Sequence, residues 1–74
     1  MSQVSIDRHV GALVRQRRLE KGMSEADLAA AVGLNAAQIH KLETGDTRIG
    51  ATLLYDLANA LEVPVGCFFE GLPA

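Results

Sequence analysis

Several residue types are scarce in this sequence, and each scarcity excludes a class of protein. The 74 residues include one cysteine and no tryptophan. One cysteine cannot build an internal disulfide framework or a zinc site made of cysteines, and it fits a reducing cytosol. No apolar run approaches the roughly 20 residues that a membrane span needs, and residues 1–10 lack the apolar part of a signal peptide. We therefore expect a cytoplasmic protein without a membrane partner.

Basic residues are also few. Seven Lys and Arg stand against nine Asp and Glu, which gives a formal net charge of −2. This balance excludes a basic protein that coats nucleic acid. The charges are uneven, however: residues 1–48 hold all seven basic and six acidic residues, a net charge of +1, whereas residues 49–74 hold only three acidic ones. Any anion-binding face must therefore be built from the first 48 residues.

The short chain argues against an enzyme. A domain of this size buries only about 60% of its unfolded surface, which leaves little to enclose a deep pocket. His9, His40 and Cys67 lie far apart and lack the spacing of metal ligands. We interpret them as surface histidines and a core cysteine. The sequence predicts no catalytic site, metal site, cofactor or small-molecule ligand.

Apolar residues recur with a helical period through most of the chain. They predict five helices, over about 7–21, 25–32, 36–44, 53–61 and 65–69. The inward stripe of the first helix is formed by Ile6, Val10, Leu13 and Val14. Sustained alternation, the signal of a strand, is missing. We predict one compact, all-α domain of five helices over residues 1–74.

The expected second and third helices carry matched end signals. Ser24 with Asp27, and Asn35 with Gln38, have the spacing of capping boxes at the two helix starts. Gly33 is placed to end the second helix. Only residues 33–35 separate the two helices, and so short a link makes them cross steeply, as in a helix-turn-helix.

Such a crossing makes three demands, and the sequence meets each of them. Ala29 supplies a small residue where the helix backbones meet, and Gly33 tolerates a positive φ in the turn. Ile39 supplies the apolar anchor beneath the third helix. An ordinary αα-hairpin would use the same residues for packing alone. The pattern predicts a helix-turn-helix at about residues 24–45.

These turn residues belong to a longer pattern over roughly residues 8–71. It consists of Val10-Gly11, Gly22-Met23-Ser24, Leu28-Ala29, Val32-Gly33-Leu34, Leu42-Glu43-Thr44-Gly45, Arg48-Ile49, Leu57-Ala58, Val63-Pro64 and Phe68-Phe69. With this pattern the chain resembles the Xre/Cro–CI family of phage-repressor-like helix-turn-helix regulators, and in particular short alphaproteobacterial members. The resemblance implies a lambda-repressor-like fold and a dimeric, sequence-specific repressor of transcription bound to a short inverted repeat in double-stranded DNA.

The resemblance also implies which side chains meet the bases. They lie on the exposed face of the third helix: Ala36, Ala37, Gln38, His40 and Lys41. Gln can bond adenine in two places, Lys can donate to guanine, and Ala can contact a thymine methyl group. Gln38 is equally suited to the capping box, and the sequence leaves both roles open.

Phosphate contacts are expected around this helix. The residues expected to make them are Ser24, Glu25, Thr44, Thr47, Arg48, Arg15 and Arg17. Ser24 begins the second helix, where free amides and the helix dipole favour an anion. Glu25 departs from the family, which usually has Gln at this position. A carboxylate suits the helix dipole but repels DNA.

Arg18 continues the stripe of the first helix, four residues after Val14. It should therefore point toward the edge of the core, where an arginine needs a partner. The resemblance pairs it with Glu43, and a solvated surface position is the alternative. We expect the buried pair.

The C-terminal segment is rich in apolar residues. The resemblance makes residues 62–74 a dimerisation segment, with an interface formed by Val63, Val65, Phe68, Phe69 and Leu72. Simple core packing is the alternative for each of them. Phe68 and Phe69 cannot both point the same way on a helix, so at least one is expected in the interface.

A second function is compatible with the same fold. Glu25, Ala36 and Ala37 weaken the expected DNA face, which favours a protein–protein interaction module, such as an antirepressor or adaptor. Gln38, Lys41 and Arg48 favour DNA.

Overall fold

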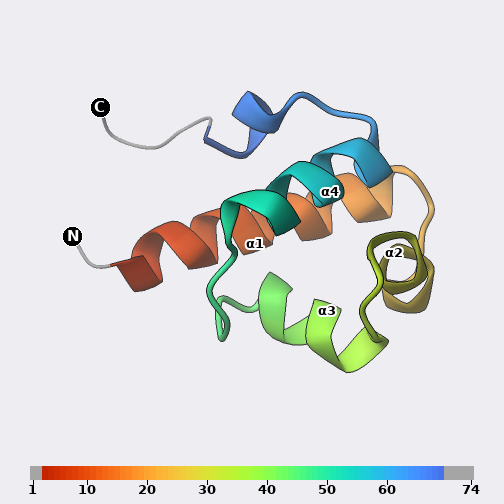
Figure 1. The fold of residues 1–74 in the computed structure, drawn as a ribbon, viewed down its shortest axis with the longest axis horizontal. Coiled ribbons are helices and arrows are strands. Elements are labelled where there is room, and N and C mark those ends of the chain that lie inside the picture. The colour runs from red at the N-terminus through yellow and green to blue at the C-terminus, as the bar shows by residue number, and fades with distance from the viewer. Residues whose placement is uncertain (1–2, 70–74) are drawn as a thin grey trace.

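The computed structural model describes residues 3–69 (Figure 1). The elements in order are α1 (Gln3–Glu20), α2 (Glu25–Val32), α3 (Ala36–Glu43), α4 (Ala51–Leu61) and a 3-10 helix, η1 (Val65–Phe69). No strand occurs within this range. In Figure 1, α1 and α4 cross the middle of the molecule, α2 and α3 lie below them, and η1 lies above.

Two expectations about the helices are corrected. The described residues form four α-helices rather than five, because the last segment is a 3-10 helix. In it the Cys67 N–H donates to the Pro64 carbonyl at 3.0 Å, an i→i+3 bond of the kind that suits segments too short for stable α-helix. α1 also begins earlier than expected, at Gln3. No helix within residues 3–69 is both long and apolar enough to cross a membrane.

One hydrophobic core joins all five elements. Its buried members are Val10, Val14, Leu28, Ala29, Ile39, Leu42, Leu54, Leu57, Ala58, Leu61 and Phe68. Ile6, expected in the inward stripe of α1, is 44% exposed instead. The core therefore begins one turn further along α1 than the sequence pattern indicates.

The link between α2 and α3 has the predicted local geometry. Both capping boxes form: Ser24 and Asp27 exchange two hydrogen bonds of 2.9 Å, and Asn35 and Gln38 exchange bonds of 2.9 and 2.8 Å. Gly33 caps α2 with φ 75°, and its N–H donates to the Ala29 carbonyl. The residue thus adopts a conformation that a side chain would strain.

α1 is joined to the end of α3 by a buried ion pair. Arg18 Nε and one terminal nitrogen donate to the two oxygens of Glu43 at 2.6 and 3.0 Å, and the other terminal nitrogen donates to the Met23 carbonyl at 2.9 Å. The side chains of Arg18 and Glu43 are only 7% and 2% exposed. This is the pair that the family resemblance implies, and it sets how α3 is presented.

Gly11 lets the two helices approach at the same junction. A Cβ at this position would overlap the backbone carbonyl oxygen of Leu42 and lie 3.0 Å from that of Glu43. Those atoms belong to the last turn of α3, so they cannot move aside as a flexible side chain would. The orientation of α3 therefore depends on a glycine and an ion pair, both supplied through α1.

Candidate nucleic-acid interface

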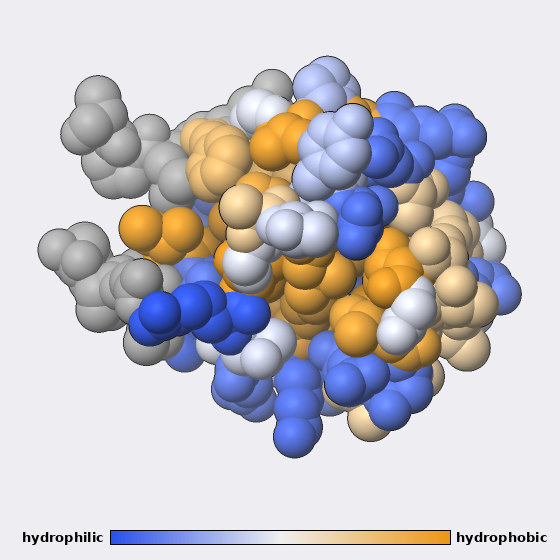
Figure 2. All heavy atoms as spheres, viewed as in Figure 1, coloured by the Kyte–Doolittle hydropathy of each residue, from blue (hydrophilic) through white to orange (hydrophobic). Residues whose placement is uncertain are grey.

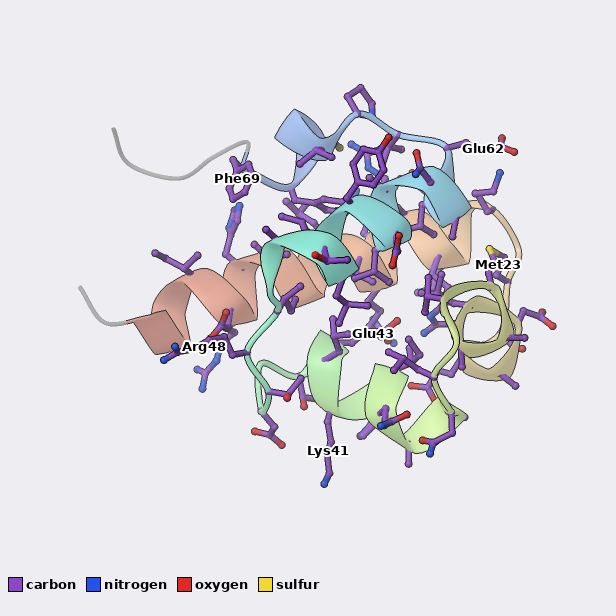
Figure 3. The ribbon with its side chains drawn as sticks, viewed as in Figure 1. Met23, Lys41, Glu43, Arg48, Glu62 and Phe69 are labelled. Atoms are coloured by element: carbon purple, nitrogen blue, oxygen red, sulfur yellow. The ribbon has the colours of Figure 1, made fainter. Side chains whose placement is uncertain are left out.

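The outer face of α3 is open to solvent. Ala37, Gln38, His40 and Lys41 are exposed, and Ala36 is half-buried. Lys41 extends away from the body of the molecule (Figure 3). The opposite face of the same helix carries Ile39, Leu42 and Glu43, which are buried. The helix therefore presents five side chains of the predicted base-contacting set on one accessible side.

Gln38 takes the capping role, one of the two roles that the sequence left open. Its Oε1 accepts a hydrogen bond from the Asn35 N–H at 2.9 Å. The amide NH2 remains available to donate. A two-point contact with adenine needs both ends of the amide, and Gln38 Oε1 keeps a second lone pair beside the capping bond.

The start of α2 holds a contact that sequence reasoning missed. Glu25 Oε2 lies 3.1 Å from His40 Nδ1. These residues are 15 positions apart, so no local spacing indicates the contact; the steep crossing of α2 and α3 creates it. The Glu25 carboxylate is therefore already engaged by the outer face of α3. Ser24 beside it accepts from the Asp27 N–H at 2.9 Å and keeps its hydroxyl hydrogen for another acceptor.

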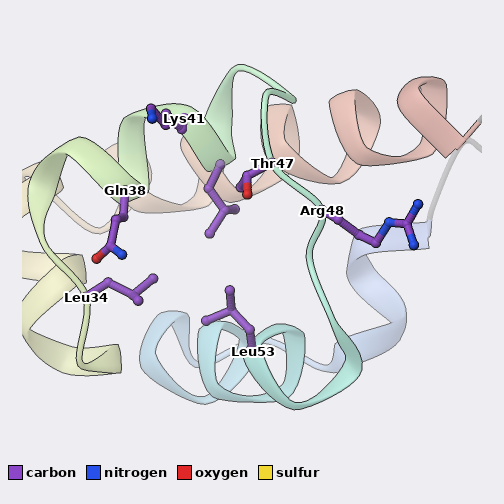
Figure 4. A pocket seen from close by; sticks show the side chains of 7 residues that line it. Leu34, Gln38, Lys41, Thr47, Arg48 and Leu53 are labelled. Atoms are coloured by element: carbon purple, nitrogen blue, oxygen red, sulfur yellow. The ribbon is translucent and has the colours of Figure 1, made fainter.

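The loop after α3 lies beside a shallow hollow of about 270 Å³. Its lining comes from the turn, α3, the loop and α4: Leu34, Gln38, Lys41, Leu42, Thr47, Arg48 and Leu53. Thr47 points into the hollow, while the guanidinium of Arg48 extends away from it (Figure 4). Figure 2 shows hydrophobic atoms in the middle of this face and hydrophilic ones along the edge formed by α3. The Thr44 hydroxyl donates to the Lys41 carbonyl at 3.0 Å, so its hydrogen is not available to a phosphate.

Arg15 and Arg17, both expected to contact phosphates, lie on different sides of α1. Arg17 donates hydrogen bonds to Cys67 and Glu20, and these bonds raise the pKa of Arg17. Cys67 lies in η1, on the side of α1 opposite α3 (Figure 1). Arg17 is thus corrected from a phosphate-contacting residue to one that faces η1. Arg15 is exposed and follows Gly11 by one helical turn, which keeps it on the α3 side.

Phe68 and Phe69 have opposite environments. Phe68 is completely buried in the monomer, whereas Phe69 is 46% exposed. The expectation that Phe68 lies in an interface is corrected. Its side chain is part of the core, and η1, which carries it, packs against α1 and α4. Val63 and Val65 are half-buried. Leu72, also expected in the interface, lies outside the described residues.

Most carboxylates near α2 and α3 are already engaged. Glu43 holds Arg18, and hydrogen bonds from this partnership raise the pKa of Arg18. Asp27 accepts from the Ser24 N–H, which lowers the pKa of Asp27. Glu25 contacts His40. Of these contacts, only that with Arg18 supplies a permanent positive charge, whereas a hydrogen bond from a neutral group leaves the charge of a carboxylate in place.

Residues 14–66 match the protein family described as Helix-turn-helix. The chain is 46% identical over 67 residues to an uncharacterized transcriptional regulator in the ATPase CF(0) region of Rhodospirillum rubrum, and the match covers 90% of this chain and 62% of that one. It is 44% identical over 68 residues to an uncharacterized helix-turn-helix-type transcriptional regulator of Sinorhizobium medicae, covering 92% and 49%. The chain thus spans about half or somewhat more of these relatives.

A solved structure has the same fold. The restriction-modification controller protein C.AhdI from Aeromonas hydrophila superimposes with a TM-score of 0.86 at 25% sequence identity. The match covers 93% of this chain and 100% of that one. The likeness extends over the whole arrangement of helices and is not confined to the turn between α2 and α3.

Proposed function

The chain belongs to the Xre/Cro–CI-type helix-turn-helix family of bacterial transcriptional regulators, and on this premise we propose that it binds a specific DNA sequence and regulates transcription there. The observation that carries the proposal is the outer face of α3, which is exposed, projects from the molecule and holds donors for base edges. Such a regulator acts in the cytoplasm, at the DNA.

In this proposal α3 enters the major groove. The Lys41 ammonium and the free amide NH2 of Gln38 donate to base acceptors, as guanine offers with O6 and N7. Ala36 and Ala37 are small enough to let the helix approach closely and to contact a thymine methyl group. His40 completes the set of base-contacting residues.

Phosphate contacts flank α3 in the same proposal. The Ser24 hydroxyl and the amides at the start of α2 face one strand, while Thr47 and Arg48 in the loop after α3 face the other. Arg15 adds a cation on the α3 side of α1. Thr44 is left out of this set, because its hydroxyl donates to the Lys41 carbonyl and its backbone N–H donates to the His40 carbonyl.

We also propose a homodimer that binds a short inverted repeat and represses transcription. A single α3 reads too few base pairs for a unique site, and two copies related by a two-fold axis read two half-sites about one helical turn apart. Phe69 is exposed and Val63 and Val65 are half-buried, and this accessible apolar surface in the last part of the described chain supports an interface there. The controller protein of the same fold supports a regulatory role.

Fluorescence anisotropy tests DNA binding, with fragments recovered by genome-wide capture on the 74-residue chain. We expect preference for a recovered site over random duplex and weakening as salt rises. Lys41→Ala should weaken specific binding by about tenfold. Lys21→Ala is the matched control, because Lys21 pairs with Glu62 at 2.9 Å, away from α3. Equal, weak binding to every duplex would contradict the proposed DNA-binding function. It would favour the protein–protein interaction module, which needs no side chains that distinguish bases.

Sedimentation equilibrium tests the dimer separately. Phe69→Asp should shift the protein to monomer while the helical circular dichroism stays unchanged, and it should lose cooperative binding to the inverted repeat. A monomeric wild type at the concentrations that saturate its site would contradict the dimer. A promoter reporter with and without the protein then gives the sign of regulation.

A further inference from the structure

The contact between Glu25 and His40 joins the start of α2 to the outer face of α3. The carboxylate oxygen Oε2 lies 3.1 Å from imidazole Nδ1, and the side chains are 34% and 67% exposed. His40 thus has one ring nitrogen held by the protein, while most of the ring remains open on the side where DNA is proposed to bind.

The chemistry of the two groups decides where the hydrogen lies. An ionised carboxylate accepts hydrogen bonds and cannot donate them. The hydrogen in this contact must therefore sit on His40 Nδ1. In a neutral imidazole the second nitrogen then carries no hydrogen, so His40 Nε2 is an acceptor.

We propose that Glu25 is a positioning residue that fixes the His40 ring, so that Nε2 accepts from a base with an amino group in the major groove. Cytosine N4 and adenine N6 are the groups of this kind. The inference rests on the proposed function and deepens it, because it names the bases that one residue of α3 selects. It also gives Glu25 a role other than phosphate contact.

The first test uses the free protein and needs no DNA. Nitrogen NMR of the imidazole distinguishes a ring nitrogen that carries hydrogen from one that does not. At about pH 8, we expect hydrogen on Nδ1 of His40 in the wild type and a smaller population of this form in Glu25→Ala. Glu20→Ala is the matched control, because Glu20 contacts Arg17 on α1. Hydrogen on Nε2 in the wild type would overturn the inference whether or not the protein binds DNA.

The second test selects sites from a randomised duplex pool at about pH 8. His40→Ala identifies the base pair that His40 reads, because preference is lost there. At that pair we expect the wild type to prefer cytosine or adenine by about threefold to tenfold. Glu25→Ala should lose the preference, while Glu20→Ala keeps it.

The outcomes separate the two proposals. If the wild type selects sites and Glu25→Ala retains the same base preference, the positioning role is overturned while the regulator stands. If the wild type selects no site at all, the regulator fails, and the base selection by His40 fails with it. The imidazole spectrum of the free protein still decides whether Glu25 holds the ring.

Discussion

Two carboxylate contacts meet α3 from different sides, and they differ in burial. Glu43 meets Arg18 beneath the helix, with two short hydrogen bonds and almost no exposure to solvent. Glu25 meets His40 on the outer face, with one longer contact in a largely exposed position. Arg18 is a permanent cation and the His40 ring is a hydrogen-bond partner, and water screens only the second contact.

The difference in burial separates a contact that holds the fold from one that can change while the protein stays folded. A buried charge that loses its partner cannot be rescued by solvent, so the Arg18–Glu43 pair resists change and holds α3 in place. An exposed pair contributes little to folding. The Glu25–His40 pair can therefore be altered by substitution without loss of the fold. The buried Arg18–Glu43 pair thus lies on the inner side of α3, and the exposed Glu25–His40 pair lies on its outer side.

Removing one partner of the buried pair should have the largest effect. We expect Arg18→Ala to lower the free energy of unfolding by about 3–5 kcal/mol, because Glu43 is left buried without a cation. Urea denaturation followed by circular dichroism measures the change. Arg15→Ala is the control, since Arg15 is exposed on the same side of α1, and it should change stability by less than about 0.5 kcal/mol. Equal small effects would show that the pair does not hold α3.

Gly11→Ala should have the next largest effect, since it forces α1 and the end of α3 apart. The added Cβ would overlap backbone atoms of Leu42, and we expect a loss of about 1–3 kcal/mol. Gly66→Ala serves as the control, because nothing lies within 4 Å of a Cβ there. A Gly11→Ala protein as stable as the wild type would mean that the junction adapts, and the contrast between the two sides of α3 would weaken.

The capping box of α2 is expected to give a smaller, pH-dependent effect. Ser24→Ala should cost about 1 kcal/mol. The hydrogen bond from the Ser24 N–H lowers the pKa of Asp27, so the Asp27 contribution is present above its unfolded pKa and is lost as pH falls through the folded value. The Tm difference between wild type and Asp27→Asn should therefore narrow with acidification. A Tm difference that does not change with pH would contradict a role of the Asp27 carboxylate in the capping box.

Glu25→Ala should have the smallest effect on folding. The pair with His40 is exposed, and we expect a change below about 1 kcal/mol in the free energy of unfolding. The same urea titration measures it beside Arg18→Ala. A loss as large as that of Arg18→Ala would remove the distinction between the two contacts and make Glu25 a structural residue.

Local patterns predicted the parts of the site that depend on neighbours in sequence. The capping boxes of Ser24 and Asn35 formed as their spacing indicated, because their donors and acceptors lie within one helical turn. The length of the last helix could not be obtained this way. A segment of five residues can form either an α-helix or a 3-10 helix. In the structure it is a 3-10 helix that packs against α1 and α4 with Phe68 buried.

Contacts between distant residues were predicted only where the family resemblance supplied them. Arg18 and Glu43 are 25 positions apart, and the inward stripe of α1 indicated only that Arg18 needs a partner. The same reasoning placed Arg17 at the DNA face, although a rotation of about 100° per residue turns it toward Cys67 in η1. A helical stripe predicts which residues point inward, but not which element they meet.

The order of residues alone settled the helical class, the steep turn between α2 and α3 and the capping at their starts, because each depends on periodicity or on hydrogen bonds over three or four positions. Tertiary packing decided that Phe68 is core while Phe69 is surface, that Arg17 faces η1, and that Glu25 engages His40. Those outcomes depend on the angles at which whole helices cross, and these angles follow from all the packed side chains together.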